Sequence, residues 1–172
     1  KPIIGAEIFV CKNLHSKNNT AEDRRRHQLV LLVKNEVGYK NLMKIISIAQ
    51  LEGFYYKARA DKNLLRQYSD GLIALSGSLQ GEISSEIIYG NYERAKIAAL
   101  EYQDIFGVGN FYLELGPNFE YESQTIANQG LVQISQETSI PVVAACDAHY
   151  IKKEHRKIQD ILLCIRDNKK VT

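Results

Sequence analysis

Ile140-Pro141-Val142-Val143-Ala144-Ala145-Cys146 is followed at once by Asp147-Ala148-His149-Tyr150. The apolar run, opened by proline and rich in valine, is typical of a buried parallel strand. Because side chains alternate along an extended chain, an Asp and a His two residues apart can face one point beyond the end of the strand. In barrels and open α/β sheets, active sites and ligand-binding sites lie at that end of the strands. The stretch therefore predicts an α/β fold in which Asp147 and His149 form half of a metal site.

Strand-like and helix-like segments alternate along the rest of the chain. We expect strands over residues 3–10, 28–34, 71–76, 111–115 and 140–146. We expect helices over residues 36–49, 62–68, 82–89, 92–106, 124–138 and 154–166. This order implies a mostly parallel sheet with outer helices. Because the strands are too few for a closed eight-stranded barrel, the prediction is an incomplete or smaller barrel.

Three local features refine this outline. Asp61 and the pair Ser84-Ser85 are expected to cap helices, and Gly107 is expected to end one. On the helix over residues 36–49, we expect Leu42, Ile45, Ile46 and Ala49 to share the buried face. Residues 12–26 form the longest stretch without a regular pattern, and long loops in compact domains are often functional or mobile.

Composition sets further bounds. The chain has 172 residues, which predicts one domain over residues 1–172. Its net charge is +2, so the overall charge does not by itself predict binding to nucleic acid or to a membrane surface. Three widely spaced cysteines are typical of a reducing cytoplasm. No apolar stretch reaches the length of a membrane span. The chain begins without Met and runs at once into a strand, so we expect a segment of a longer protein whose first strands are missing.

Two further residues are candidate metal ligands. Glu7 lies in a run that is apolar on both faces, so we expect a buried carboxylate that needs a partner such as a cation. His27 opens the next strand, and it is a candidate because it could converge with Glu7, Asp147 and His149 on one end of the sheet. Two imidazoles and two carboxylates suit Zn, Mn or Fe better than Mg or Ca. The alternative to a metal site is that Glu7 faces solvent and that His27 is an ordinary surface residue.

Several runs together resemble one family. They are Ile3–Val10, His27–Glu36, Gly38–Leu42, Glu52–Lys57, Gly71–Gly77, Phe111–Leu115, Asp147–Tyr150 and Asp160–Ile165. In this order they are similar to the PHP (polymerase and histidinol phosphatase) domain of the alpha subunits of bacterial DNA polymerase III. The runs Gly38-Tyr39-Lys40-Asn41-Leu42 and Glu52-Gly53-Phe54-Tyr55-Tyr56 are specific to the polymerase branch of that family. The resemblance covers nearly the whole chain.

The resemblance implies a distorted (β/α)7 barrel whose strand ends carry up to three divalent metal ions. The family's ligands in this stretch fall on Glu7, His27, Asp147 and His149. Members with a full ligand set are proposed to act as metal-dependent 3′→5′ proofreading exonucleases, with metal-bound water as the nucleophile. In other members the domain is a catalytically decayed scaffold that supports the polymerase and binds a separate proofreading exonuclease subunit. DNA would be bound through the full-length polymerase, and no individual catalytic residue is assigned.

Two departures from the family pattern argue against activity of this segment alone. Ser78 stands where active members carry a cysteine ligand, and a hydroxyl is a poorer ligand for a borderline metal. The family's opening His-x-His motif is expected upstream of Lys1. Four functions therefore remain open: part of a replicative polymerase, a metal-dependent phosphoesterase in its native context, a non-enzymatic scaffold, and a stand-alone histidinol-phosphatase-like enzyme, which the polymerase-specific runs disfavour.

Overall fold

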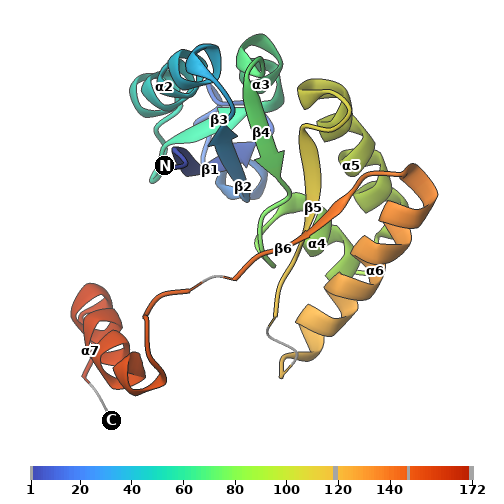
Figure 1. Ribbon diagram of the computed structural model, residues 1–172. Helices are drawn as coiled ribbons and strands as arrows, with labels where there is room; N and C mark the ends of the chain where they lie inside the picture. The colour runs from blue at the N-terminus through green and yellow to red at the C-terminus, as the bar shows by residue number, and fades with distance from the viewer. Residues whose placement is uncertain (1, 118–119, 147, 171–172) are drawn as a thin grey trace.

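The computed structural model describes residues 2–117, 120–146 and 148–170. Within these residues, one six-stranded sheet has the order β3-β1-β2-β4-β5-β6 (Figure 1). The strands are β1 (Gly5–Cys11), β2 (His27–Val33), β3 (Arg59–Asp61), β4 (Leu72–Leu75), β5 (Phe111–Leu115) and β6 (Val142–Ala144). The helices are α1 (Ala21–Arg24), α2 (Glu36–Leu51), α3 (Lys62–Tyr68), α4 (Glu82–Ile88), α5 (Tyr92–Phe106), α6 (Glu122–Thr138), the short 3₁₀ turn η1 (Lys153–His155) and α7 (Arg156–Asp167).

One strand runs against its neighbours. β2 is antiparallel to β1 and β4, whereas the pairs β1–β3, β4–β5 and β5–β6 are parallel. The start of β2 therefore lies at the same edge of the sheet as the ends of β1 and β4. The α/β class, the mostly parallel sheet and the outer helices are confirmed. In the part of the chain that the structure describes, β3 and β6 are the two outer strands of the sheet, so closure into a (β/α)7 barrel stays a prediction.

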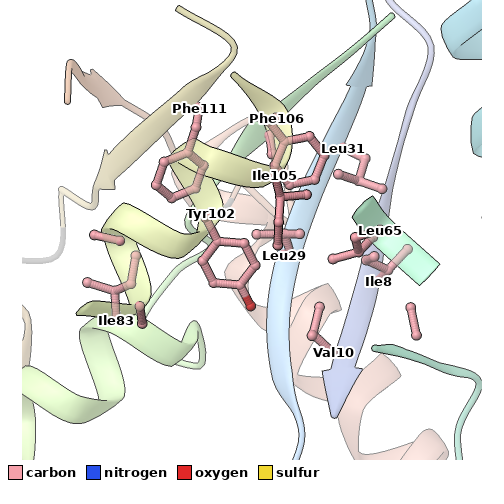
Figure 2. Packing of buried hydrophobic residues seen from close by; sticks show 14 of the residues in the cluster. Ile8, Val10, Leu29, Leu31, Leu65, Ile83, Tyr102, Ile105, Phe106 and Phe111 are labelled. Carbon is pink, nitrogen blue, oxygen red and sulfur yellow. The ribbon is translucent and has the colours of Figure 1, made fainter. Parts of the chain in front are cut away.

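The core lies on one face of this sheet. Ile8 and Val10 of β1 and Leu29 and Leu31 of β2 point toward the helices and are almost fully buried (Figure 2). Helix α5 supplies the facing layer through Tyr102, Ile105 and Phe106, and the Tyr102 ring stacks on Phe111 with the centroids 5.5 Å apart. On the other face of the sheet, Val30, Leu32, Ile73 and Leu75 are only half-buried. The sheet is thus covered unequally, which decides how its polar residues are exposed.

The sequence pattern located most elements well. All five predicted strands and all six predicted helices are present, and their ends all fall within two residues of the prediction. Asp61 caps α3 by accepting a hydrogen bond from the Leu64 N–H at 2.9 Å, and Gly107 ends α5 with a φ of 84°. On α2, Leu42, Ile45 and Ala49 are buried as predicted.

Five details of the prediction are wrong. The last strand is shorter than predicted by two residues at each end, and Val142 and Ala144 are exposed rather than buried. Ser84 and Ser85 lie inside α4, whose N-cap is Gly81. Ile46 is 42% exposed, because Gly38 takes the fourth place on the buried face of α2. Residues 12–26 include helix α1, and strand β3 was not predicted at all.

Helix α7 lies apart from the sheet and the other helices (Figure 1). Its apolar residues recur at the predicted helical spacing, and they are exposed: Ile158, Ile161, Leu162 and Ile165. None of its described residues is buried. Helix α7 therefore contributes little to the core.

Candidate functional site

His27 is placed at the expected edge of the sheet. It is the first residue of β2 and is paired in register with Val10, near the end of β1. The neighbouring Gln28 N–H donates to the Gln80 carbonyl at 3.0 Å, which ties the start of β2 to the turn that follows β4. Because β2 is antiparallel, His27 lies where β1 and β4 end. The antiparallel direction could not be read from the pattern of β2 itself.

Glu7 lies elsewhere on the same pair of strands. It is in register with Val30, in the middle of β1, and its side chain is exposed. Since side chains alternate along a strand, the register puts Glu7 on the half-buried face of the sheet, whereas Val10 and its partner His27 belong to the helix-covered face. The expectation of a buried Glu7 carboxylate is therefore wrong. Its physical cause is the unequal covering of the two faces.

The other predicted ligands follow β6. His149 is exposed in the segment after this strand, and Asp147 lies outside the described residues. Among the residues that the structure describes, no three His, Cys, Asp or Glu side chains come together in a group that could hold a metal ion. The described donors thus do not fit a metal centre on their own, and no catalytic step follows from them. The four-ligand set of Glu7, His27, Asp147 and His149 stays a prediction.

Ser78, at the position of the family's cysteine ligand, lies close to this edge. Its hydroxyl donates a hydrogen bond to Oε1 of Gln28 at 2.9 Å. The preceding Gly77 has a φ of 78°, a left-handed conformation that favours glycine, and a Cβ there would lie 2.6 Å from the Gln28 carbonyl. The turn is therefore packed tightly against β2. In this structure, Ser78 joins the turn to the strand.

A charged pocket of about 640 Å³ opens beside His27 on the helix-covered side. Lys62 bridges Glu82 and Glu101 at 3.0 and 2.8 Å, and Arg25 pairs with Glu86 at 3.1 Å. Burial lowers the pKa of His27 against the opposing effect of the nearby Glu82. At neutral pH the imidazole is therefore mostly uncharged.

Arg59 is a structural residue that the sequence reasoning missed. Its side chain is fully buried, and the guanidinium donates to the carbonyls of Gly53, Asp23, Leu14 and Ser16 at 3.0, 2.6, 3.2 and 3.0 Å. These contacts hold the segment over residues 12–26 against strand β3. A charged residue in the short run Arg59–Asp61 gave no strand signal, which explains the omission.

Comparison with known proteins decides the family. The family model described as "PHP domain" matches residues 1–118 of this chain. The chain belongs to the PHP domain family. Curated relatives named DNA polymerase III subunit alpha are 44% identical in Borreliella burgdorferi, over 96% of this chain, and 38% identical in Treponema pallidum, over 98%. The relative in Aquifex aeolicus is 36% identical over 99% of the chain.

The PHP chain is short beside these relatives. It spans 14% of the length of the Borreliella and Treponema proteins and 15% of the Aquifex protein. The family match ends at residue 118, so His149 lies beyond it. None of the helices in the described part of this PHP chain is long and apolar enough to cross a membrane. The predicted resemblance to the PHP domain of DNA polymerase III alpha subunits is confirmed.

Proposed function

We propose that this chain is the PHP region of a bacterial DNA polymerase III alpha subunit and acts in DNA replication within that longer DNA-directed polymerase. The carrying observation is identity of 36–44% over nearly the whole chain with relatives that bear that name. We extend the domain to residues 1–172, because the relatives align well past residue 118. DNA and the remainder of the subunit are the proposed partners, and the cytoplasm is the proposed location.

The test of this role uses the longer protein that contains the segment. The full subunit should extend a primed DNA template, and a variant lacking residues 1–172 should lose synthesis or thermal stability. A matched control removes only residues 156–172, which include the exposed helix α7. A full-length protein that does not synthesise DNA would contradict the proposal.

Within this role we propose that Glu7, His27, Asp147 and His149 contribute ligands for Zn or Mn, completed by residues upstream of the chain. The support is the chemistry of the donors and the place of His27 at the edge where the parallel strands end. Because Glu7 is exposed on the opposite face, its part in this centre requires that residues of the longer polymerase cover this part of the sheet or that the sheet rearranges. Proofreading exonuclease activity would depend on that complete centre. The non-enzymatic alternative is a scaffold that binds a proofreading subunit.

Metal content distinguishes these two possibilities. It should be measured by plasma mass spectrometry on this chain and on a version extended through the upstream strands. Two or three equivalents in the extended protein, lost in Asp147→Ala and kept in the exposed control Asp70→Ala, are expected for a working centre. The absence of metal from both proteins would contradict the ligand set and leave the PHP scaffold.

A further inference from the structure

A second pocket, which we call the basic pocket, is also lined by His27. It measures about 640 Å³, and its lining includes Arg24, Arg25, Arg26, Phe9 and Tyr89. Among the described residues that line it there is no Asp or Glu. Three successive arginines therefore meet in one hollow without a carboxylate in its wall. Such a wall attracts anions.

The arginines differ in what they already bind. Arg25 is paired with the Glu86 carboxylate at 3.1 Å. Arg24 donates through Nε to the amide oxygen of Asn19 at 3.0 Å, and Arg26 donates through Nη1 to the Arg24 carbonyl at 3.3 Å. These last two acceptors are neutral, and among the described residues no carboxylate is paired with Arg24 or Arg26. A phosphate can still gain charge-assisted hydrogen bonds from both.

The arginines are carried by an ordered segment. Thr20 and Asp23 form a capping box at the start of α1, with the Asp23 N–H donating to the Thr20 hydroxyl at 3.1 Å. Buried Arg59 then holds the Asp23 carbonyl at 2.6 Å. The Arg26 guanidinium lies 5.6 Å from the centre of the Phe9 ring, which orients it further. The arginines are thus positioned before any ligand arrives, which lowers the entropy lost on binding.

The neighbouring charged pocket differs from the basic pocket in the charges that line it. Both pockets share Arg25 and His27, but the charged pocket also holds four glutamates, which are offset in part by Lys12 and Lys62. Because the described wall of the basic pocket holds three arginines and no carboxylate, a phosphate is attracted more strongly to the basic side. A strand passing this edge would therefore keep its backbone over Arg24 and Arg26.

An exposed aromatic ring completes the basic pocket. Tyr89 follows the last residue of α4 and is 71% exposed. Phe9 is already covered by Arg26, so Tyr89 is the aromatic face that a base can reach. Aromatic rings beside a positive groove are the usual means of holding single-stranded nucleic acid without sequence preference.

We propose that the basic pocket binds single-stranded DNA, with phosphates on Arg24 and Arg26 and a base stacked on Tyr89. Of the proposed metal ligands, His27 lines the basic pocket, and the pocket's described lining includes neither Glu7 nor His149. It goes beyond the proposed function, because it requires neither metal nor a polymerase active site. Failure to bind DNA here would leave the family assignment unchanged.

The test measures fluorescence anisotropy of a labelled oligothymidine as the chain is titrated at several salt concentrations. Each lost phosphate contact should reduce the slope of log affinity against log salt by about 0.7, so Arg24→Gln and Arg26→Gln should each show that change. Tyr89→Ala should weaken binding about tenfold while the salt slope stays the same. The separation of charge from stacking is the signature of the proposed site.

Matched controls use exposed residues outside the basic pocket. Arg94→Gln removes the same charge from α5, and Tyr121→Ala removes an aromatic ring that is 63% exposed. Both should bind like the unmodified chain. Equal losses in Arg94→Gln and Arg26→Gln would overturn the proposal in favour of diffuse charge attraction. Binding of a DNA duplex as tightly as the single strand would also overturn the proposal. So would displacement of the oligothymidine by inorganic phosphate at a concentration equal to that of the oligothymidine.

Discussion

Replacing Arg59 with methionine should loosen the segment that carries the basic pocket. Methionine fills much of the same space but cannot donate to the four carbonyls that Arg59 now satisfies. A hydrogen bond to a charged group contributes about 1.5–3 kcal/mol. This loss of stabilising free energy is partly offset, because the variant no longer buries a guanidinium, whose desolvation costs several kcal/mol.

The net effect expected for Arg59→Met is a loss of about 3–5 kcal/mol in the free energy of unfolding. For a domain of this size, about 2–4 °C in melting temperature corresponds to each kcal/mol, so the midpoint should fall by roughly 10 °C. Arg59→Lys should recover only part of the loss, because an ammonium has three donors and no planar fork. Circular dichroism melts of the three proteins measure these differences.

Limited trypsin digestion locates the effect. In Arg59→Met, the bonds after Lys12, Lys17 and Arg24 should be cut faster, because the carbonyls on either side have lost their anchor. The control Arg94→Met changes an exposed arginine and should neither melt earlier nor be cut faster. If Arg59→Met melts within about 2 °C of the parent and shows no faster cleavage, the assignment of Arg59 as the anchor is refuted.

Two further predictions concern packing and thiol chemistry. Gly38→Ala should lower the free energy of unfolding by about 1–3 kcal/mol, because its Cβ would lie 1.8 Å from the Gly71 carbonyl oxygen, although alanine is normally favoured in a helix. Urea unfolding of this variant beside the exposed control Ser47→Ala measures the change. Unchanged stability in Gly38→Ala would contradict the close packing. Burial raises the pKa of the Cys11 thiol, so at pH 8 this buried thiol should react with a thiol reagent far more slowly than exposed Cys146, and guanidinium should abolish the difference. Equal native rates would show that Cys11 is not enclosed.

The candidate site shows how far a pattern of residues can lead. His27 was predicted to open a strand, and the structure confirms its place at the edge where β1 and β4 end. Glu7 was expected to be buried because its neighbours are apolar, yet its side chain is exposed. Burial depends on what covers each face of the sheet, and the residues adjacent to Glu7 in the chain do not reveal that.

Arg59 and the three arginines show the opposite case. A run of arginines in a polar segment reads as a solvated loop, and a buried arginine in a three-residue strand gives no periodic signal. Their meeting depends on contacts between residues 12–26 and β3, which lie far apart in the chain. The sequence shows the basic run over residues 24–26, but only the tertiary structure shows that these arginines line one pocket.

The sequence by itself determined most of the elements, all but α1 and β3, because helix and strand periodicity depend on residues only a few places apart. It also determined the family, since the motifs occur in order along the chain. Only the tertiary structure decided that β2 runs antiparallel, that Glu7 and His27 belong to different faces, and that Arg59 anchors the arginine segment. These outcomes come from pairing and packing between distant segments, whose free energy is shared among many residues and cannot be assigned to any local pattern.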